Sequence, residues 1–181
     1  MRRLVIILAD GLRPDAVSPT LMPSLDALGD AYTLARRAQT VRPSATVAAL
    51  ASLATGVGPE THRLIEPGLR FLPRLGRIRP VAWELARAGI PADIVTADHG
   101  GGGVTANEHD EPHPVNDHIP LILAGPGVTR RHQLTRTISL LDVPATVLWW
   151  FGVPVPTCYE GRPLSEAFAR VAGPAPQPSV A

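Results

Sequence analysis

Residues 94–100, Ile-Val-Thr-Ala-Asp-His-Gly, end a short apolar run with an acid and an imidazole, and three more glycines follow. The N-terminal apolar run at residues 4–9 also ends in a carboxylate, Asp10. In an open parallel sheet the carboxyl ends of the strands form one rim, where ligands collect. If both runs are strands of such a sheet, Asp10, Asp98 and His99 meet at this rim. Their oxygen and nitrogen atoms suit a divalent, zinc-type ion, so the sequence predicts a metal-based centre.

The bulk composition is typical of a soluble globular protein with one core. The chain has 181 residues, of which 45% are hydrophobic and 18% charged. A net charge of +1 gives no electrostatic reason to expect nucleic acid or an anionic membrane as a partner. The single cysteine, Cys158, excludes an internal disulfide and a cysteine-based zinc site. No run approaches the roughly 20 apolar residues of a membrane span, and the N-terminal run is too short for a signal peptide. We therefore expect a cytoplasmic protein.

Short apolar runs alternate with helical patterns along the chain. The candidate strands are residues 3–9, 33–40, 90–97 and 119–124. The candidate helices are residues 24–31 with Ser24 as N-cap, 47–54 with Gly56 as stop, 80–88 and 140–151. This alternation predicts an α/β layered domain, in which a mainly parallel sheet is flanked by helices. We expect a single domain over residues 1–172 and a Pro-rich flexible tail at 173–181.

Between the two acidic strand ends lies a segment of small residues, 43–56, Pro-Ser-Ala-Thr-Val-Ala-Ala-Leu-Ala-Ser-Leu-Ala-Thr-Gly, with Pro59 and His62 after it. This segment resembles the nucleophile segment of the alkaline phosphatase superfamily, particularly its nucleotide pyrophosphatase/phosphodiesterase branch. In that family a Thr or Ser opens a helix that ends in Thr-Gly, and Pro and His follow shortly after. Residues 119–127 and 141–146 are similar to the family's C-terminal core. The resemblance therefore implies an alkaline-phosphatase-like core.

The resemblance implies a role for each matching residue. Thr46 matches the nucleophile, Asp10 the first metal ligand, and Asp98 and His99 the paired Asp-His ligand motif. His109 matches the late His ligand, by its distance from the C-terminal core, and Thr46 itself could complete the ligand set. The implied reaction is in-line attack by Thr46 on a small phosphoric ester, then hydrolysis of the phosphothreonine by a metal-activated water. The implied cofactor is a divalent ion, with zinc as the expected metal.

Each of these residues also has a structural alternative. Asp10 could belong to a tight turn with the following glycine, and Asp98 could solvate a loop. Thr46 could be a helix N-cap, which is a common role for threonine. Two neighbouring histidines, at 113 and 118, could take the role of His109 in its place. His62 is expected to be structural, because the family usually has His-Gly where this chain has His-Arg.

The centre of the chain departs from the family pattern. Family members usually carry a long segment before the Asp-His pair, with an Asp-x-x-x-His motif that ligates the second metal. The interval from residue 64 to residue 97 contains no such motif, so we expect one bound ion rather than two. Two hypotheses follow: a metal-dependent hydrolase of phosphoric esters, or a catalytically inactive shortened relative or fragment with at most one metal site. A sulfatase is a weaker interpretation, because Cys158 does not lie in a Cys/Ser-x-Pro-x-Arg context.

Overall fold

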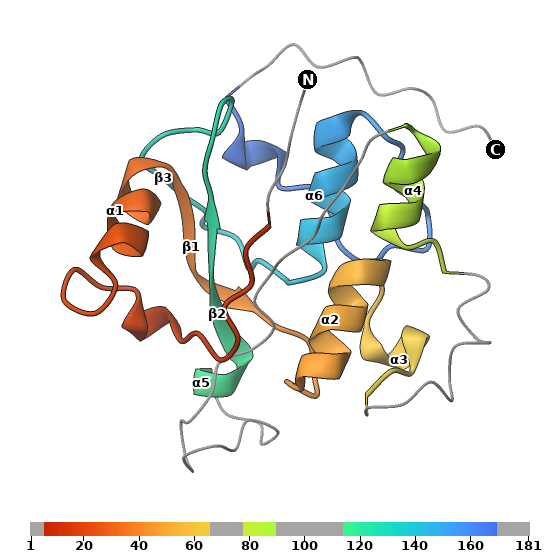
Figure 1. Cartoon of the computed structure of the whole chain (residues 1–181), viewed down its shortest axis with the longest axis horizontal. Coiled ribbons are helices and arrows are strands. Elements are labelled where there is room, and N and C mark those ends of the chain that lie inside the picture. The colour runs from red at the N-terminus through yellow and green to blue at the C-terminus, as the bar shows by residue number, and fades with distance from the viewer. Residues whose placement is uncertain (1–5, 66–77, 90–113, 170–181) are drawn as a thin grey trace.

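The computed structural model describes residues 6–65, 78–89 and 114–169, and these form an α/β arrangement. Figure 1 shows a small sheet with helix α1 (Pro23–Ala31) on one side and helices α2 (Thr46–Thr55), α4 (Val81–Arg87) and α6 (Asp142–Phe151) on the other. The predicted α/β class is therefore confirmed. No helix in these three ranges is long and apolar enough to cross a membrane.

The described residues form a three-stranded sheet in the order β2-β1-β3. Strand β1 (Thr33–Gln39) pairs antiparallel with β2 (His118–Leu123), and an irregularity in register lies between Ala35 and Ala38. The short strand β3 (His132–Gln133) runs parallel to β1. Where we expected a mainly parallel sheet, this part of the sheet is mixed and its longer ladder is antiparallel. The direction of β2 is fixed by ladder bonds to β1, which the apolar pattern of a strand does not encode.

One of the two strands that suggested a parallel rim was expected at residues 3–9. Residues 6–9 form no ladder with the described strands. Instead, Ile6 and Leu8 pack their side chains against the core. The other predicted strand, residues 90–97, lies outside the described residues, as does the predicted tail at 173–181.

The helices follow the predicted pattern closely. The remaining elements are α3 (Pro59–His62), α5 (Pro114–Asp117) and the 3-10 turns Pro14–Ala16 and Ser165–Ala167. Helices α2 and α6 both end at a left-handed glycine, Gly56 with φ 74° and Gly152 with φ 73°, which is a common helix stop. The prediction of Ser24 as N-cap of α1 is wrong: the N-cap is Met22. Proline suits the first helical position because its φ is fixed near the helical value, so α1 begins at Pro23.

The core has two buried clusters. The larger one joins β1, β2 and α2 to the start of α6, with Ala48, Ala49 and Leu53 of α2 among its members. The second packs Val81 and Leu85 of α4 against α6 and the segment after it. Since α2 contacts α6 and α6 contacts α4, the three helices form one layer.

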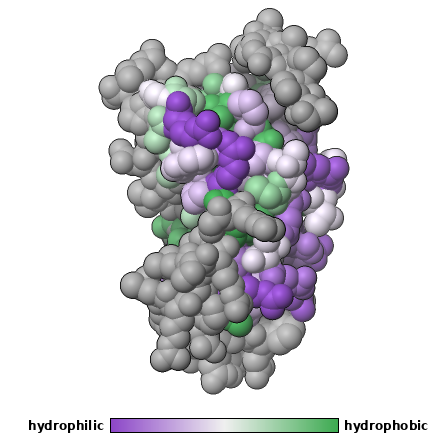
Figure 2. All heavy atoms as spheres, turned by 90° about the vertical axis from the view of Figure 1, so that its right-hand side faces the viewer, coloured by the Kyte–Doolittle hydropathy of each residue, from purple (hydrophilic) through white to green (hydrophobic). Residues whose placement is uncertain are grey.

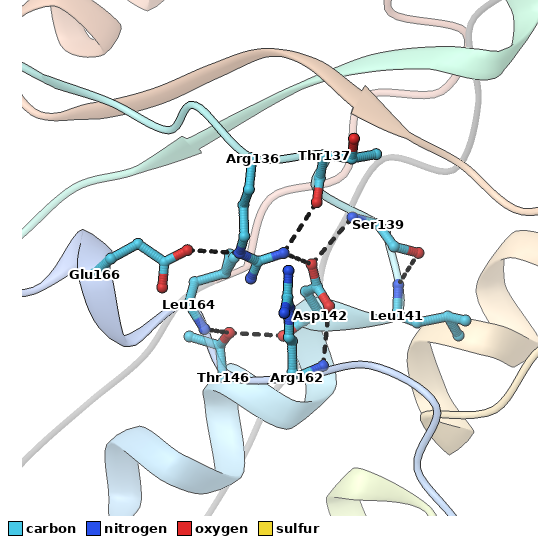
Figure 3. Close-up of polar contacts among 9 residues, drawn as sticks. All are labelled: Arg136, Thr137, Ser139, Leu141, Asp142, Thr146, Arg162, Leu164 and Glu166. Carbon is cyan, nitrogen blue, oxygen red and sulfur yellow. Dashed lines mark hydrogen bonds and ion pairs between the residues drawn. The ribbon is translucent and has the colours of Figure 1, made fainter.

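A buried polar network fixes the start of α6 (Figure 3). One oxygen of Asp142, Oδ2, accepts hydrogen bonds from Arg136 Nη1 at 2.8 Å and from the Ser139 N–H at 3.1 Å. The other, Oδ1, accepts the Arg162 N–H at 2.9 Å. Arg136 Nε also donates to Glu166 at 2.6 Å. The network therefore ties α6 to the chain segments on both sides of it.

The outer face of α4 carries an aromatic ring between two cations. Trp83 is 49% exposed. The guanidinium of Arg79 lies 5.6 Å from its ring centroid and that of Arg87 lies 4.7 Å from it. Figure 2 views the molecule from the side of α4 and shows hydrophilic residues beside a few hydrophobic ones among the coloured atoms. The stacked cations thus cover part of the exposed indole.

Candidate active site

Thr46, the predicted nucleophile, is the first residue of α2. The N-cap of this helix is Ala45, which has extended backbone angles (φ −102°, ψ 143°) and accepts the Ala49 N–H at 3.0 Å. The alternative role of Thr46 as N-cap is therefore wrong. Because the side chain of Ala45 has no oxygen, it cannot cap the N–H groups of the first turn. The helix dipole gives the N-terminal end of α2 a partial positive charge, which favours a phosphoryl or sulfuryl oxygen there.

The position of Thr46 is fixed by the packing of α2. The helix buries Ala48, Ala49, Ser52 and Leu53, whose small or compact side chains let it enter the core. Thr46 itself is partly buried. A helix that is anchored along most of its length holds its first residue in place, which is what a nucleophile requires.

The far end of α2 is fixed by close contact with Tyr159. A Cβ atom added at Gly56 would lie 2.3 Å from the Tyr159 ring, and the backbone there is left-handed. The Tyr159 hydroxyl donates to the Arg79 carbonyl at 2.8 Å, and burial raises the pKa of the phenol. Glu160 N–H donates to the Gly56 carbonyl at 2.9 Å. This glycine is therefore required both for its conformation and for its lack of a side chain.

His62 has a structural role, as predicted. Its side chain is 0% exposed, and its Nδ1 accepts the Leu64 N–H at 2.9 Å. The proton must then reside on Nε2, which lies 2.9 Å from Ser52 Oγ and donates to it. Burial lowers the pKa of the imidazole and outweighs the Ala48 carbonyl and the Glu160 carboxylate, which both favour the charged form. The neutral ring links α3 to the middle of α2.

The next residue, Arg63, occupies a backbone conformation that favours glycine. Its φ is 61° and its ψ is 18°, and it terminates α3. The resembling family usually has glycine at this position. An arginine therefore occupies a left-handed conformation here, at an energetic cost of roughly 1–2 kcal/mol.

The predicted metal ligands are only partly within the described residues. Asp10 is exposed and lies in a turn with Gly11, whose φ is 65°, so the turn expected as the structural alternative is present and leaves the carboxylate at the surface. Asp98, His99 and His109 lie outside the described residues. Within the described ranges, no group of three or more His, Cys, Asp or Glu side chains could hold a metal ion. The convergence of the five predicted site residues therefore stays a prediction.

An ion pair near Thr46 was not predicted from the sequence. Arg42 lies in the connection between β1 and α2, and its Nη2 donates to Asp117 Oδ2, at the junction of α5 and β2. The Thr40 N–H donates to the Asp117 carbonyl at 2.9 Å. The partners are 75 residues apart in the chain, so no spacing pattern could have indicated the pair.

Comparison with known proteins agrees with this organisation. The family model for type I phosphodiesterase / nucleotide pyrophosphatase matches residues 4–71, which include Asp10, Thr46 and His62. Arylsulfatase K of Canis lupus familiaris is 34% identical to the chain over 76 residues, and the enzyme of Bos taurus is 33% identical over the same length. The human arylsulfatase K is 32% identical over 76 residues.

In each of these three relatives the match covers 39% of this chain and 14% of the relative. The chain therefore corresponds to a small part of their length. The family match falls on the segment that carries β1 and α2. The N-terminal part of this chain is therefore similar to type I phosphodiesterases / nucleotide pyrophosphatases and to arylsulfatase K.

Proposed function

We propose that this chain is a metal-dependent hydrolase of small phosphoric esters and that Thr46 is its nucleophile. The observation that supports this most directly is the position of Thr46 at the start of α2, beside a helix end that Ala45 cannot cap. The helix lies within the segment matched by the phosphodiesterase family model. The order of elements, β1 then α2 with Thr46 at its first position, is what a strand-end nucleophile needs.

We propose the following roles for the residues of this chain in the reaction. The Thr46 hydroxyl loses its proton and its oxygen forms a bond to phosphorus, while the bond to the leaving-group oxygen breaks and the leaving group takes up a proton. The N–H groups in the first turn of α2 stabilise the charge on the phosphoryl oxygens. Water then cleaves the phosphothreonine, so that one water is consumed and the hydroxyl of Thr46 is restored.

Asp10, Asp98, His99 and His109 are the residues proposed to hold the metal, with Thr46 as a further ligand. A divalent ion bound by such oxygen and nitrogen atoms lowers the pKa of a coordinated hydroxyl or water and offsets negative charge on the ester. Zinc suits this mixture of carboxylate and imidazole ligands. One ion per chain is the proposed stoichiometry, because the sequence lacks the Asp-x-x-x-His motif for a second ion.

Sulfuric esters are a second candidate substrate class, because the curated relatives are named arylsulfatase K. A sulfuryl group is tetrahedral like a phosphoryl group and can use the same helix end. The third possibility is a catalytically inactive domain that keeps the fold, since the sequence lacks the ligand motif of a second metal. Substrate comparison separates the three.

The test compares wild type with Thr46→Ala, and Thr55→Ala is the matched control. Thr55 lies at the other end of α2 and its hydroxyl donates to the Ala51 carbonyl at 2.6 Å. The zinc-loaded proteins are assayed with nitrophenyl phosphate, bis-nitrophenyl phosphate and nitrophenyl sulfate. We expect cleavage of a phosphoric ester by wild type and by Thr55→Ala, and a loss of at least about 10³-fold in kcat for Thr46→Ala. Full activity in Thr46→Ala excludes this nucleophile. A wild type that binds zinc and cleaves none of the three esters is the inactive relative.

A further inference from the structure

The connection that leads from β1 to Thr46 is held at two points by one residue. Asp117 accepts the Thr40 N–H through its carbonyl at 2.9 Å, and its carboxylate accepts a hydrogen bond from Arg42. Between these two contacts the chain leaves the sheet, and four residues after Arg42 it reaches Thr46. Asp117 thus restrains the segment that presents the proposed nucleophile.

The two members of this ion pair differ in exposure. The side chain of Asp117 is 12% exposed, whereas that of Arg42 is 64% exposed. The second carboxylate oxygen of Asp117, Oδ1, is buried without a hydrogen-bond partner among the described residues. The Asp117 carboxylate is therefore fixed inside the protein, and it binds the solvent-facing guanidinium of Arg42 at one nitrogen.

A guanidinium held in this way can bind a second anion. It carries five N–H donors in one plane, and Asp117 Oδ2 accepts only at Nη2. The remaining donors have the spacing that matches two oxygens of a phosphate or sulfate group. Four extended residues span at most about 14 Å, so a long Arg side chain and a small ester together can bridge the distance from Arg42 to Thr46.

In the sequence, Arg42 and Asp117 lie on either side of the proposed ligands Asp98, His99 and His109. Arg42 precedes the nucleophile by four residues, and Asp117 follows His109 by eight. The ion pair between them brings the last residue of α5 next to the connection that leads to Thr46.

From this juxtaposition we infer that Arg42 binds the anionic group of the substrate and that Asp117 is the residue that positions it. The inference rests on the proposed function and adds a substrate-binding residue to it. The guanidinium of Arg42 adds a fixed positive charge to the site, in a chain that lacks the Asp-x-x-x-His motif for a second metal ion. The ligand class is a small ester with a non-bridging anionic oxygen pair, phosphate or sulfate.

The inference is tested by calorimetric titration of the zinc-loaded protein with inorganic phosphate and, separately, sulfate. Arg42→Gln should weaken binding of the preferred anion by about 10- to 100-fold, the range of one or two charge-assisted hydrogen bonds. Arg42→Lys should recover part of it, because the charge remains and the planar fork is lost. The control is Arg37→Gln, which removes an exposed arginine of β1 and should bind the anion as wild type does.

The Asp117→Asn variant shows whether Asp117 positions the Arg42 side chain or only neutralises its charge. If Asp117 only neutralised Arg42, its removal would tighten anion binding; if it positions Arg42, binding weakens by several-fold and KM rises with kcat nearly unchanged. Circular dichroism confirms that each variant is folded. Tighter binding in Asp117→Asn overturns the role of Asp117, and unchanged anion affinity in Arg42→Gln overturns that of Arg42. If wild type cleaves esters and Arg42→Gln has the same KM as wild type, this inference alone is refuted. If wild type neither binds anions nor cleaves esters, the proposed function is refuted as well.

Discussion

Replacing Asp142 by Asn should be among the most destabilising isosteric changes in this chain. The side chain of Asp142 is 5% exposed and accepts hydrogen bonds from Arg136, Ser139 and Arg162 (Figure 3). An amide keeps the shape but offers only one acceptor oxygen, so its NH₂ group must face at least one of these donors. It also leaves Arg136 with one countercharge, Glu166, instead of two. Removing one partner of a buried ion pair costs about 3–5 kcal/mol, out of a total stability of about 5–15 kcal/mol.

The measurement is urea denaturation of wild type and Asp142→Asn, followed by circular dichroism. With a slope of about 1–3 kcal/mol/M, the midpoint should fall by roughly 1–3 M. Glu166→Gln is the control, because Glu166 binds the same guanidinium but its side chain is 40% exposed, and it should cost less than about 1 kcal/mol. The reasoning is refuted if Asp142→Asn costs under about 1 kcal/mol, or no more than Glu166→Gln does.

Three further predictions concern the ends of α2 and α3. Gly56→Ala should lower the free energy of unfolding by about 2–5 kcal/mol, because it adds strain at φ 74° and a clash 2.3 Å from Tyr159. The control Gly89→Ala, at φ 69° in open space, should lower it by only about 1–2 kcal/mol, and equal losses of stability in urea would contradict the contact with Tyr159. Arg63→Gly should raise the free energy of unfolding by about 1 kcal/mol, which thermal denaturation would detect as a higher Tm; a lower Tm would argue against strain at this residue. Burial holds the pKa of His62 below 6.5, so its contribution to stability is complete above that pH and declines as the pH falls from 6.5 through the folded-state pKa. His62→Gln should show a shallower decline between pH 7 and pH 5, and an equally steep one would exclude His62 as the group responsible.

The sequence was most informative where a local pattern determines the structure. Helix α2 was predictable because its small apolar residues end at Gly56, and α6 because its apolar pattern ends at Gly152. Strand β1 was predictable from its composition, but the direction of its pairing with β2 was not. Pairing direction depends on partners about 85 residues away rather than on neighbours in the chain.

The residues of the candidate site could be predicted only where they belong to a sequence motif. Thr46 could be assigned to the start of a helix from the resemblance alone, and the structure adds that Ala45 rather than Thr46 is the N-cap. The pairing of Arg42 with Asp117 could not be predicted, because an arginine before a proline and an aspartate before a strand are each unremarkable alone. Such a contact becomes visible only when the sheet brings the two ends together.

The mixed sheet has a consequence for how the chain folds during synthesis. Strand β1 belongs to the segment matched by the phosphodiesterase family model, yet its neighbours β2 and β3 are made much later. At about 5–20 residues per second, a ribosome needs roughly 4–17 seconds to extend the chain from the end of β1 to the end of β2. During that interval both hydrogen-bonding edges of β1 lack their final partners, and an unpaired edge is prone to intermolecular association. A fragment that stops at residue 71 would remain in this state, because it lacks both strands that pair with β1.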